Sequence, residues 1–359
     1  MSDAIGVFVP QVTDALFHFH FSNCRLIDKI AVYNDYDTFI SSQHERKVAC
    51  FQMPCPFDGD FDQEVNIFAA ICDTVIILCS ELHGRIIDFI RRHDQTNISY
   101  FICGALNFDM QHSPVHPWHD WFITTKHFYK HIKPEFLNQL NPYEPKERMF
   151  DLLLGTKKAH RDVAYNYVKQ NNLNDQVIMT YFKSQTITQK FDEHDNDEWI
   201  WPEGYTAPKD RDTNWTVTIV DYQGYRMSLS QIIPIQIYNS SVYTLVAETN
   251  AENDWVFFTE KIVKPILARR LFIVLGNRYY LKALQDLGFK TFNDIIDESY
   301  DTQEFSRADI AMKQLGWLCS QPQQEILDKI KPICDHNYNL MMNTDWYGQY
   351  FISKFITYF

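Results

Sequence analysis

Continuous apolar segments that alternate with helix-spaced segments are the feature that most constrains the fold of this chain. Residues 74–79 (TVIILC) and 271–275 (LFIVL) are uninterrupted apolar runs, as expected of strands buried on both faces of a parallel sheet. Residues 82–92 follow the first run and have apolar side chains at 82, 86, 87 and 90, which is helix spacing. This alternation predicts an α/β layer architecture.

Further segments fit the same alternation along the chain. We expect additional strands at 30–33, 100–103, 120–124, 150–154, 177–181, 216–220 and 243–248, and helices at 160–170 and 260–270. Residues 183–215 are polar and irregular and are interpreted as a long loop.

A change in composition near residue 141 divides the chain. Residues 141–148 (NPYEPKER) contain two prolines and four charges, which is typical of a linker. We therefore predict an α/β lobe over 1–140, a linker at 141–149, a second α/β lobe over 150–335, and a C-terminal helix over 336–359. Aromatic residues at 347, 351, 355 and 358 have the spacing of that helix. Proteins with two lobes usually bind their ligand in the cleft between them.

Glycine spacing excludes several nucleotide-binding folds. The chain of 359 residues has eleven glycines, and the closest two are Gly276 and Gly288. The G-x-G-x-x-G and G-x-x-x-x-G-K-[ST] motifs both need closely paired glycines. An ordinary Rossmann dehydrogenase, a P-loop NTPase and a protein kinase are therefore excluded, and a nucleotide would have to be held in another way.

Charge and cysteine usage limit partners and location. Lys and Arg number 33 against 46 Asp and Glu, a net charge of −13, which argues against nucleic acid as a partner. The eight cysteines form no C-x-x-C pair, so we expect reduced thiols and a cytoplasmic location, in the host cytoplasm for a viral protein. The chain shows no signal-peptide pattern and no apolar run near ~20 residues, so no membrane span is expected.

The segment 242–292 carries the clearest chemical signal. Thr259 can cap a helix whose first residues are Glu260 and Lys261. A helix N-terminus with an adjacent ammonium suits phosphate, and a carboxylate can accept hydrogen bonds from ribose hydroxyls. The same residues would also fit an ordinary capped helix that binds no ligand and whose Glu-Lys pair is solvated.

Three parts of this segment carry a resemblance: residues 247–250 (AETN), 257–261 (FFTEK) and 272–276 (FIVLG). Together they resemble the donor-binding segment of inverting α1,3-fucosyltransferases and related GT-B glycosyltransferases. The resemblance implies a GT-B fold, with two Rossmann-like α/β lobes, an inter-lobe cleft, and a C-terminal helix over 336–359 that crosses back to the first lobe. It covers roughly residues 150–300, and the chain is also similar to uncharacterised glycosyltransferase-like proteins of phages and large viruses.

The resemblance implies a role for each matched residue. Glu260 would bind ribose hydroxyls and Lys261 the diphosphate. Phe257 would lie against the base and Glu248 would face the donor sugar. Asn250 is also included among the donor-binding residues, although it lies one position later than the asparagine of the family.

A second donor contact is implied in the strand-turn-helix segment 152–167. The family has an arginine here that clamps the donor diphosphate, and Arg161 matches it best. Arginine binds phosphate through two parallel hydrogen bonds. Lys157, Lys158 and His160 precede it, and the alternative is a helix N-terminus with scattered basic residues.

The first lobe is expected to supply the acceptor side and the base. Glu81 follows the 74–79 strand directly, and ligands of open α/β sheets bind beyond the carboxyl ends of strands. Glu81 is therefore the candidate base, with His83 as its partner or alternative. An ordinary helix cap at Ser80 would explain the same residues, and Asp109 and Asp120 are weaker candidates.

Metal-binding patterns are present but weak. Five histidines lie close in sequence, and for them we favour a structural or acceptor-contact role: His112, His116, His119, His127 and His131. D-x-D pairs occur at 58–60, 60–62, 195–197 and 210–212, as expected by chance in an acidic chain. We therefore predict no metal and no cofactor.

The sequence leads to the hypothesis of an inverting, metal-independent glycosyltransferase. It would move a sugar, with fucose as one candidate, from a nucleotide-sugar donor to a glycan or other hydroxyl acceptor, with a GDP-sugar favoured. The alternatives are a non-catalytic glycan- or nucleotide-binding protein on a transferase scaffold, and a viral enzyme that glycosylates modified DNA bases.

Overall fold

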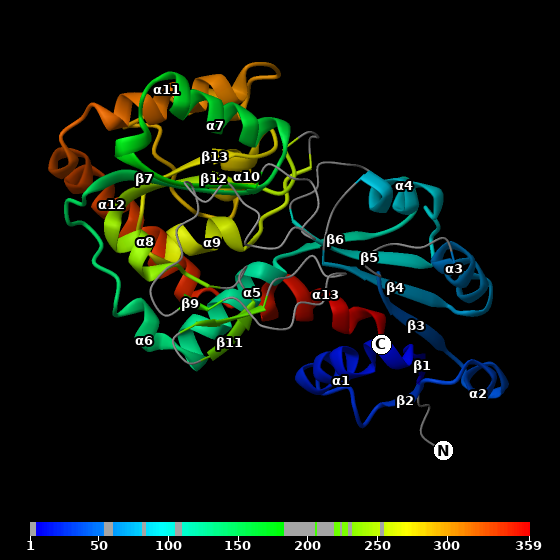
Figure 1. The fold of residues 1–359 in the computed structure, drawn as a ribbon. Coiled ribbons are helices and arrows are strands. Elements are labelled where there is room, and N and C mark those ends of the chain that lie inside the picture. Colours follow the sequence, from blue (N-terminus) through cyan, green and yellow to red (C-terminus); the bar gives the residue numbers. More distant parts are fainter. Residues whose placement is uncertain are drawn as a thin grey trace. The chain divides into compact units, whose positions relative to one another are not determined.

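The computed structural model of the chain contains two compact units, whose elements are labelled in Figure 1. It describes residues 5–53, 60–80, 84–104, 110–182, 205–206, 219–222, 225–228, 232–251 and 255–359. Met1–Asp120 and Asp345–Phe359 form the first unit, and Trp121–Thr344 form the second. Within the described ranges, no helix is long and apolar enough to cross a membrane.

The first unit is built on a six-stranded sheet in which all neighbouring strands are parallel. The strand order is β2-β1-β3-β4-β5-β6. The strands are β1 (Ile5–Phe8), β2 (Ile30–Tyr33), β3 (Lys47–Gln52), β4 (Thr74–Cys79), β5 (Ile98–Cys103) and β6 (Val115–Trp118). The helices of this unit are α1 (Asp14–Asn23), α2 (Tyr36–Ser41), α3 (Asp60–Ile71) and α4 (Gly84–Arg92).

Both faces of this sheet are covered, which explains its continuous apolar strands. Tyr100 and Phe101 of β5 point to opposite faces, and both are fully buried. Phe101 packs against Phe351 near the C-terminus, with 5.2 Å between ring centroids. On the other face, Phe51 packs against Phe68 of α3 at 5.1 Å. A strand buried in this way needs apolar side chains at every position.

The C-terminal segment belongs to the first unit and is shorter than expected. In place of one helix over 336–359, α12 (Gln323–Asn343) ends inside the second unit, and short helical turns follow from Gly348 to Tyr358. Two hydrogen bonds attach these turns to the sheet unit. His20 Nδ1 pairs with the Tyr347 hydroxyl, and His116 Nε2 lies 2.5 Å from the Tyr358 hydroxyl.

The second unit has a four-stranded parallel sheet in the order β13-β12-β7-β8. Its strands are β7 (Arg148–Thr156), β8 (Val177–Phe182), β12 (Ser241–Ala247) and β13 (Phe272–Leu275). In Figure 1, α7 (Ala159–Gln170) and α11 (Arg307–Cys319) lie on one face, and α8 (Ile235–Ser240) and α9 (Glu260–Leu267) lie on the other. A separate antiparallel sheet joins β9 (Tyr205–Thr206), β10 (Ile219–Tyr222) and β11 (Tyr225–Ser228).

Two mixed α/β halves with parallel sheets therefore agree with the predicted fold class. The prediction of a strand at 120–124 is wrong, because these residues begin the helix α5 (Asp120–His127). A short apolar run does not distinguish strand from helix. Phe122 and Thr125 of α5 are buried at helix spacing, and the Phe122 ring stacks on Phe258 at 5.5 Å.

The second unit also begins earlier than the expected boundary. The segment 141–149 lies inside it and is held by several hydrogen bonds. The Asn141 N–H donates to Asn239 Oδ1 at 3.0 Å, and the Lys146 N–H donates to Gln323 Oε1 at 2.7 Å. A segment with these attachments is part of the unit, despite its two prolines.

A buried ion pair connects the strands of the second sheet. Asp151 of β7 is fully buried, and its Oδ2 accepts a 2.7 Å hydrogen bond from Arg270 Nη2. Hydroxyls of Ser241 and Thr244 donate to the same oxygen at 2.9 and 3.0 Å. Arg270 also donates to the Tyr238 carbonyl at 2.7 Å. This network links β7, β12 and the start of β13.

We expect Arg270→Leu to lower the free energy of unfolding by about 3–5 kcal/mol, because it leaves the Asp151 carboxylate buried without its cation. Urea denaturation followed by circular dichroism measures the change. Lys282→Leu removes an exposed ion pair with Asp286 and is the control, with an expected effect within about 0.5 kcal/mol. Equal effects of the two substitutions would contradict the assignment.

A buried histidine predicts how stability depends on pH. Burial lowers the pKa of His20 to about 4, against ~6.5 in an unfolded chain. The unfolded state therefore takes up a proton that the fold excludes, so the stability from His20 is complete above about pH 6.5 and falls towards pH 4. His20→Phe removes this titrating group. The free energy of unfolding should therefore fall less steeply as the pH is lowered, by up to ~1.4 kcal/mol per pH unit. Urea unfolding at pH 7, 6 and 5 tests this, and a slope equal to that of the wild type would refute it.

Candidate functional site

The reversal of strand order in the second unit marks the most suitable place for a ligand. The chain leaves β7 for α7 and β8 on one side, and β12 lies on the other side of β7. In open parallel sheets, ligands bind beyond the carboxyl ends of the strands where the order reverses. Five of the six predicted donor-binding residues follow β12, and Arg161 follows β7.

Arg161 lies across this edge, between β7 and β12. It is 4% exposed, and its Nη2 donates to the carbonyls of Ala247 and Glu248, both at 3.2 Å. Gly155 makes room for it: its φ is +64°, and an added Cβ would lie 3.3 Å from Arg161 Nη1. Burial lowers the pKa of Arg161 to about 10, so the guanidinium stays charged at neutral pH.

Residues before Arg161 also face the end of β12. His160 Nε2 lies 2.9 Å from the Glu248 carbonyl, and Lys158 Nζ donates to the Thr249 carbonyl at 2.5 Å. Lys158 is the N-cap residue of α7, and its side chain makes no capping hydrogen bond. Such a helix start presents N–H groups and a partial positive charge to the edge of the sheet.

Glu248 fixes the geometry of the site from inside. It is fully buried, and its Oε2 accepts a 2.7 Å hydrogen bond from the Thr259 hydroxyl. Its Oε1 accepts a 2.6 Å bond from the hydroxyl of Tyr280, in α10 (Tyr280–Asp286). Burial raises the pKa of this carboxyl group. The resemblance implied that Glu248 faces the donor sugar, whereas its carboxylate points inward and connects β12 to α9 and α10.

The start of α9 brings a carboxylate and two ammonium groups together. Thr259 caps the helix by accepting from the Lys261 N–H at 3.2 Å. Lys261 Nζ lies 2.8 Å from Glu260 Oε1 and donates to the Thr249 hydroxyl at 3.2 Å. Burial opposes ionisation of Glu260, but Lys261 and Lys264 outweigh it, so the pKa of Glu260 is lowered. Burial lowers the pKa of Lys264 to about 8.

Phe257 and Asn250 are the two remaining predicted donor contacts. Phe257 is 4% exposed and therefore as buried as Arg161. Its neighbour Phe258 packs edge-to-face on Tyr280 at 5.0 Å. Asn250 lies half-buried in the turn after β12, next to Thr249.

Several charged groups of the described residues gather at this edge. Arg161, Lys158, Lys261 and Lys264 are the basic residues among them, and Glu248 and Glu260 are acidic. An anion such as a diphosphate suits this combination of cations and helix N-terminus.

The predicted acceptor-side residues are only partly described. Glu81, His83 and the weaker candidate Asp109 lie outside the described residues. Asp120 follows β6 and is the first residue of α5, and burial raises its pKa to about 6. A carboxyl group with such a pKa is suited to proton transfer.

Some residues of the histidine and D-x-D patterns make contacts within the fold. His119 packs against Tyr350 at 4.9 Å, and the rings of His127 and His131 lie 5.3 Å apart. Asp62 pairs with Arg92 at 2.9 Å. In the described part of the chain, no three potential metal ligands come together.

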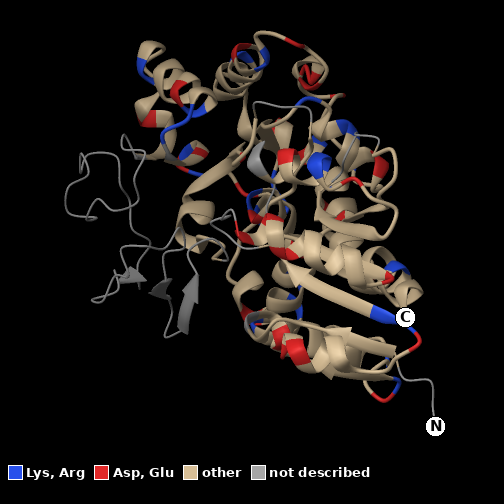
Figure 2. Cartoon of the chain, turned by 90° about the vertical axis from the view of Figure 1, so that its right-hand side faces the viewer, with Lys and Arg blue, Asp and Glu red and all other residues tan. Residues whose placement is uncertain are grey.

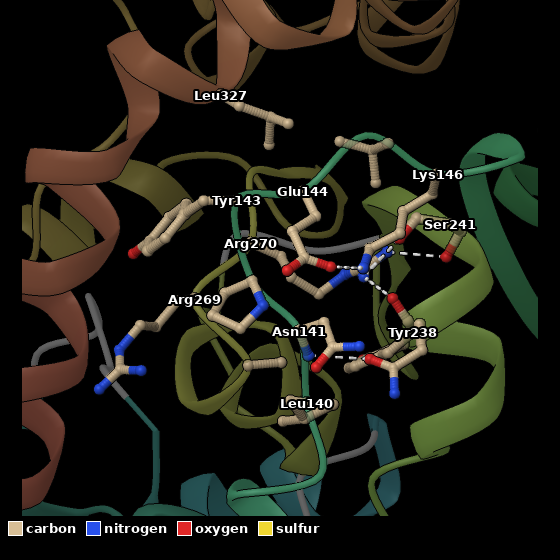
Figure 3. Close-up of a pocket in the computed structure, with 14 residues that line it drawn as sticks. Leu140, Asn141, Tyr143, Glu144, Lys146, Tyr238, Ser241, Arg269, Arg270 and Leu327 are labelled. Carbon is tan, nitrogen blue, oxygen red and sulfur yellow. Dashed lines mark hydrogen bonds and ion pairs between the residues drawn. The ribbon is translucent and has the colours of Figure 1, made fainter.

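A pocket at the opposite, amino edge of the second sheet has a different character (Figure 3). Its lining includes Lys146, Arg269 and Arg270. Figure 3 shows that the Arg270 guanidinium donates hydrogen bonds to the Tyr238 carbonyl and to the Ser241 hydroxyl. This pocket therefore belongs to the network that holds the strands together.

Charged residues are mixed over the side of the molecule seen in Figure 2, where Lys and Arg are interspersed with Asp and Glu in the described segments. This distribution accords with the net charge of −13.

Sequence reasoning missed Tyr280 as part of the site. It lies 32 residues after Glu248, and no local pattern connects the two. His160 and Lys158 were noted only as basic neighbours of Arg161, although both contact the end of β12. The sequence did show that Lys158 and His160 follow one predicted strand and that Glu248 follows another. Because the carboxyl ends of parallel strands meet at one edge, this could have predicted that these residues lie close together.

The chain matches no protein-family model and no curated protein.

We expect Glu248→Ala to lower the free energy of unfolding by about 2–4 kcal/mol, because Thr259 and Tyr280 lose a buried hydrogen-bond acceptor. Thermal and urea unfolding measure the loss. Thr249→Ala removes a neighbouring side chain that is exposed, and it is the matched control. A stability close to that of the wild type in Glu248→Ala would show that the carboxylate does not hold α9 in place.

Proposed function

We propose that this protein is an inverting, metal-independent glycosyltransferase of the GT-B type. It transfers a sugar from a nucleotide-sugar to a hydroxyl group of an acceptor, with a GDP-sugar as the favoured donor and fucose as one candidate sugar. The observation that carries the proposal is the convergence of Arg161 and the Thr259-Glu260-Lys261 helix start on one edge of a parallel sheet.

In the proposed reaction the acceptor oxygen attacks the anomeric carbon of the donor sugar. The bond from that carbon to the phosphate oxygen breaks, and a nucleoside diphosphate leaves with its bonding electrons. Arg161 and Lys261 stabilise the negative charge that develops on the diphosphate. Glu260 binds ribose hydroxyls, as the resemblance implies, and Glu81, with His83 as partner or alternative, takes the acceptor proton.

The electrostatics of the second unit support this assignment. Arg161 is positioned by two backbone carbonyls, so its guanidinium keeps its place before a ligand arrives. Side chains that are already in position need not reorganise during the reaction. They therefore stabilise the charge that develops in the transition state more effectively. Lys261 is the more exposed of the two cations and is accessible to a ligand, since 27% of its side chain is exposed.

Lys261→Ala should weaken GDP binding by roughly 10- to 100-fold, because a charge-assisted hydrogen bond to phosphate is lost. Isothermal titration calorimetry with GDP and with UDP measures this directly. Lys329→Ala, at an exposed position of α12, is the control and should bind like the wild type. Full binding and full transfer in Lys261→Ala would refute the site.

The same preparation tests the catalytic part of the proposal. Donor hydrolysis or transfer that survives EDTA agrees with metal independence, and a loss on EDTA treatment contradicts it. Binding of GDP without turnover of any donor would favour the alternative of a non-catalytic nucleotide-binding protein.

A further inference from the structure

Two histidines lie side by side at the end of α5 in the second unit. His127 is the last residue of this helix, and His131 lies in the single-turn π-helix Phe128–Ile132 that continues it. Residues four positions apart are neighbours on a helix surface. The two imidazole rings accordingly lie 5.3 Å apart between centroids, with 42° between their planes.

Both imidazoles are accessible to a ligand. His127 and His131 are exposed, and within the described residues neither takes part in a hydrogen bond or an ion pair. Two other histidines of the same cluster differ from them, because His116 is hydrogen-bonded to Tyr358 and His119 is buried. The ring nitrogens of His127 and His131 are therefore not used to hold the fold together.

The spacing of the two rings matches that of imidazoles bound to one metal ion. An imidazole nitrogen lies about 2.0–2.1 Å from Zn²⁺ and the ring centre about 1.1 Å beyond that nitrogen, which places each centre ~3.2 Å from the ion. At a tetrahedral angle, two such centres are about 5.2 Å apart. The observed separation of 5.3 Å is close to this value, so one ion can contact both rings without a change in the helix backbone.

The turn that carries the pair is fixed on its buried side. Tyr129 is fully buried, and its hydroxyl accepts a 2.6 Å hydrogen bond from the Ile233 N–H. The ammonium groups of Lys126 and Lys130 donate to carbonyls at the C-terminal end of α12, so their charges are held there. Ligands that are already in position lose less freedom when an ion binds.

We propose that His127 and His131 bind one divalent transition-metal ion, such as Zn²⁺ or Ni²⁺. Imidazole is a good ligand for these ions, whereas Ca²⁺ and Mg²⁺ prefer oxygen. No third potential ligand joins the pair among the described residues, so water occupies the remaining coordination positions. Neither histidine belongs to the proposed donor site, and the inference goes beyond the proposed function without depending on it.

Removal of either histidine tests the inference. In isothermal titration calorimetry with ZnCl₂ and with NiCl₂ at neutral pH, His127→Ala and His131→Ala should each bind about tenfold or more weakly than the wild type, because the second contact to the ion is lost. His131→Cys should retain Zn²⁺ binding, because a thiolate is also a zinc ligand. His112→Ala removes an exposed histidine outside the pair and is the control, with the affinity of the wild type.

Four results would overturn the inference. They are a wild type that binds neither ion, alanine variants of the pair that bind both ions as tightly as the wild type, an equal loss in His112→Ala, and a loss of Zn²⁺ binding in His131→Cys as large as in His131→Ala. None of these results bears on nucleotide binding, so the proposed function would stand or fall separately.

Discussion

Glu248 is the residue on which the arrangement of the candidate site depends. Its carboxylate is fully buried at the end of β12 and accepts hydrogen bonds from Thr259 and Tyr280. Thr259 in turn caps α9, so its hydrogen bond to Glu248 helps to fix the position where that helix begins. Lys261 and Glu260 are the next residues along the chain, and they are placed at the edge of the sheet as a consequence.

The two edges of the second sheet use charged residues in opposite ways. At the amino edge, each of the three side-chain nitrogens of Arg270 donates a hydrogen bond, so this residue stabilises the fold. At the carboxyl edge, Arg161 is oriented by carbonyls, which hold a guanidinium without neutralising it. Lys158, Lys261 and Lys264 also lie near this edge. Parallel sheets bind ligands at this carboxyl edge.

Much of the fold could be predicted from local patterns. The run at 74–79 matches β4 to the residue, because a strand buried on both faces is apolar throughout. The helix start at Glu260 was predicted from its Thr259 cap. The strand predicted at 120–124 is a helix instead, since five residues with mixed polarity do not define a period.

The parts of the site that depend on distant contacts could not be predicted in this way. The inward direction of Glu248 follows from Tyr280, which is far along the chain. The burial of Phe257 follows from the packing around α9, and a motif describes residue types and spacing but not burial. The resemblance predicted donor binding by this segment, and such a motif does not determine which of its side chains are buried.

The central claim is that a nucleoside diphosphate binds at the carboxyl edge of the second sheet. A crystal structure of the protein with GDP tests it most directly. The account predicts electron density for the diphosphate within hydrogen-bond distance of the Arg161 guanidinium and the Lys261 ammonium. A diphosphate bound at the amino edge, beside Lys146 and Arg269, would contradict it.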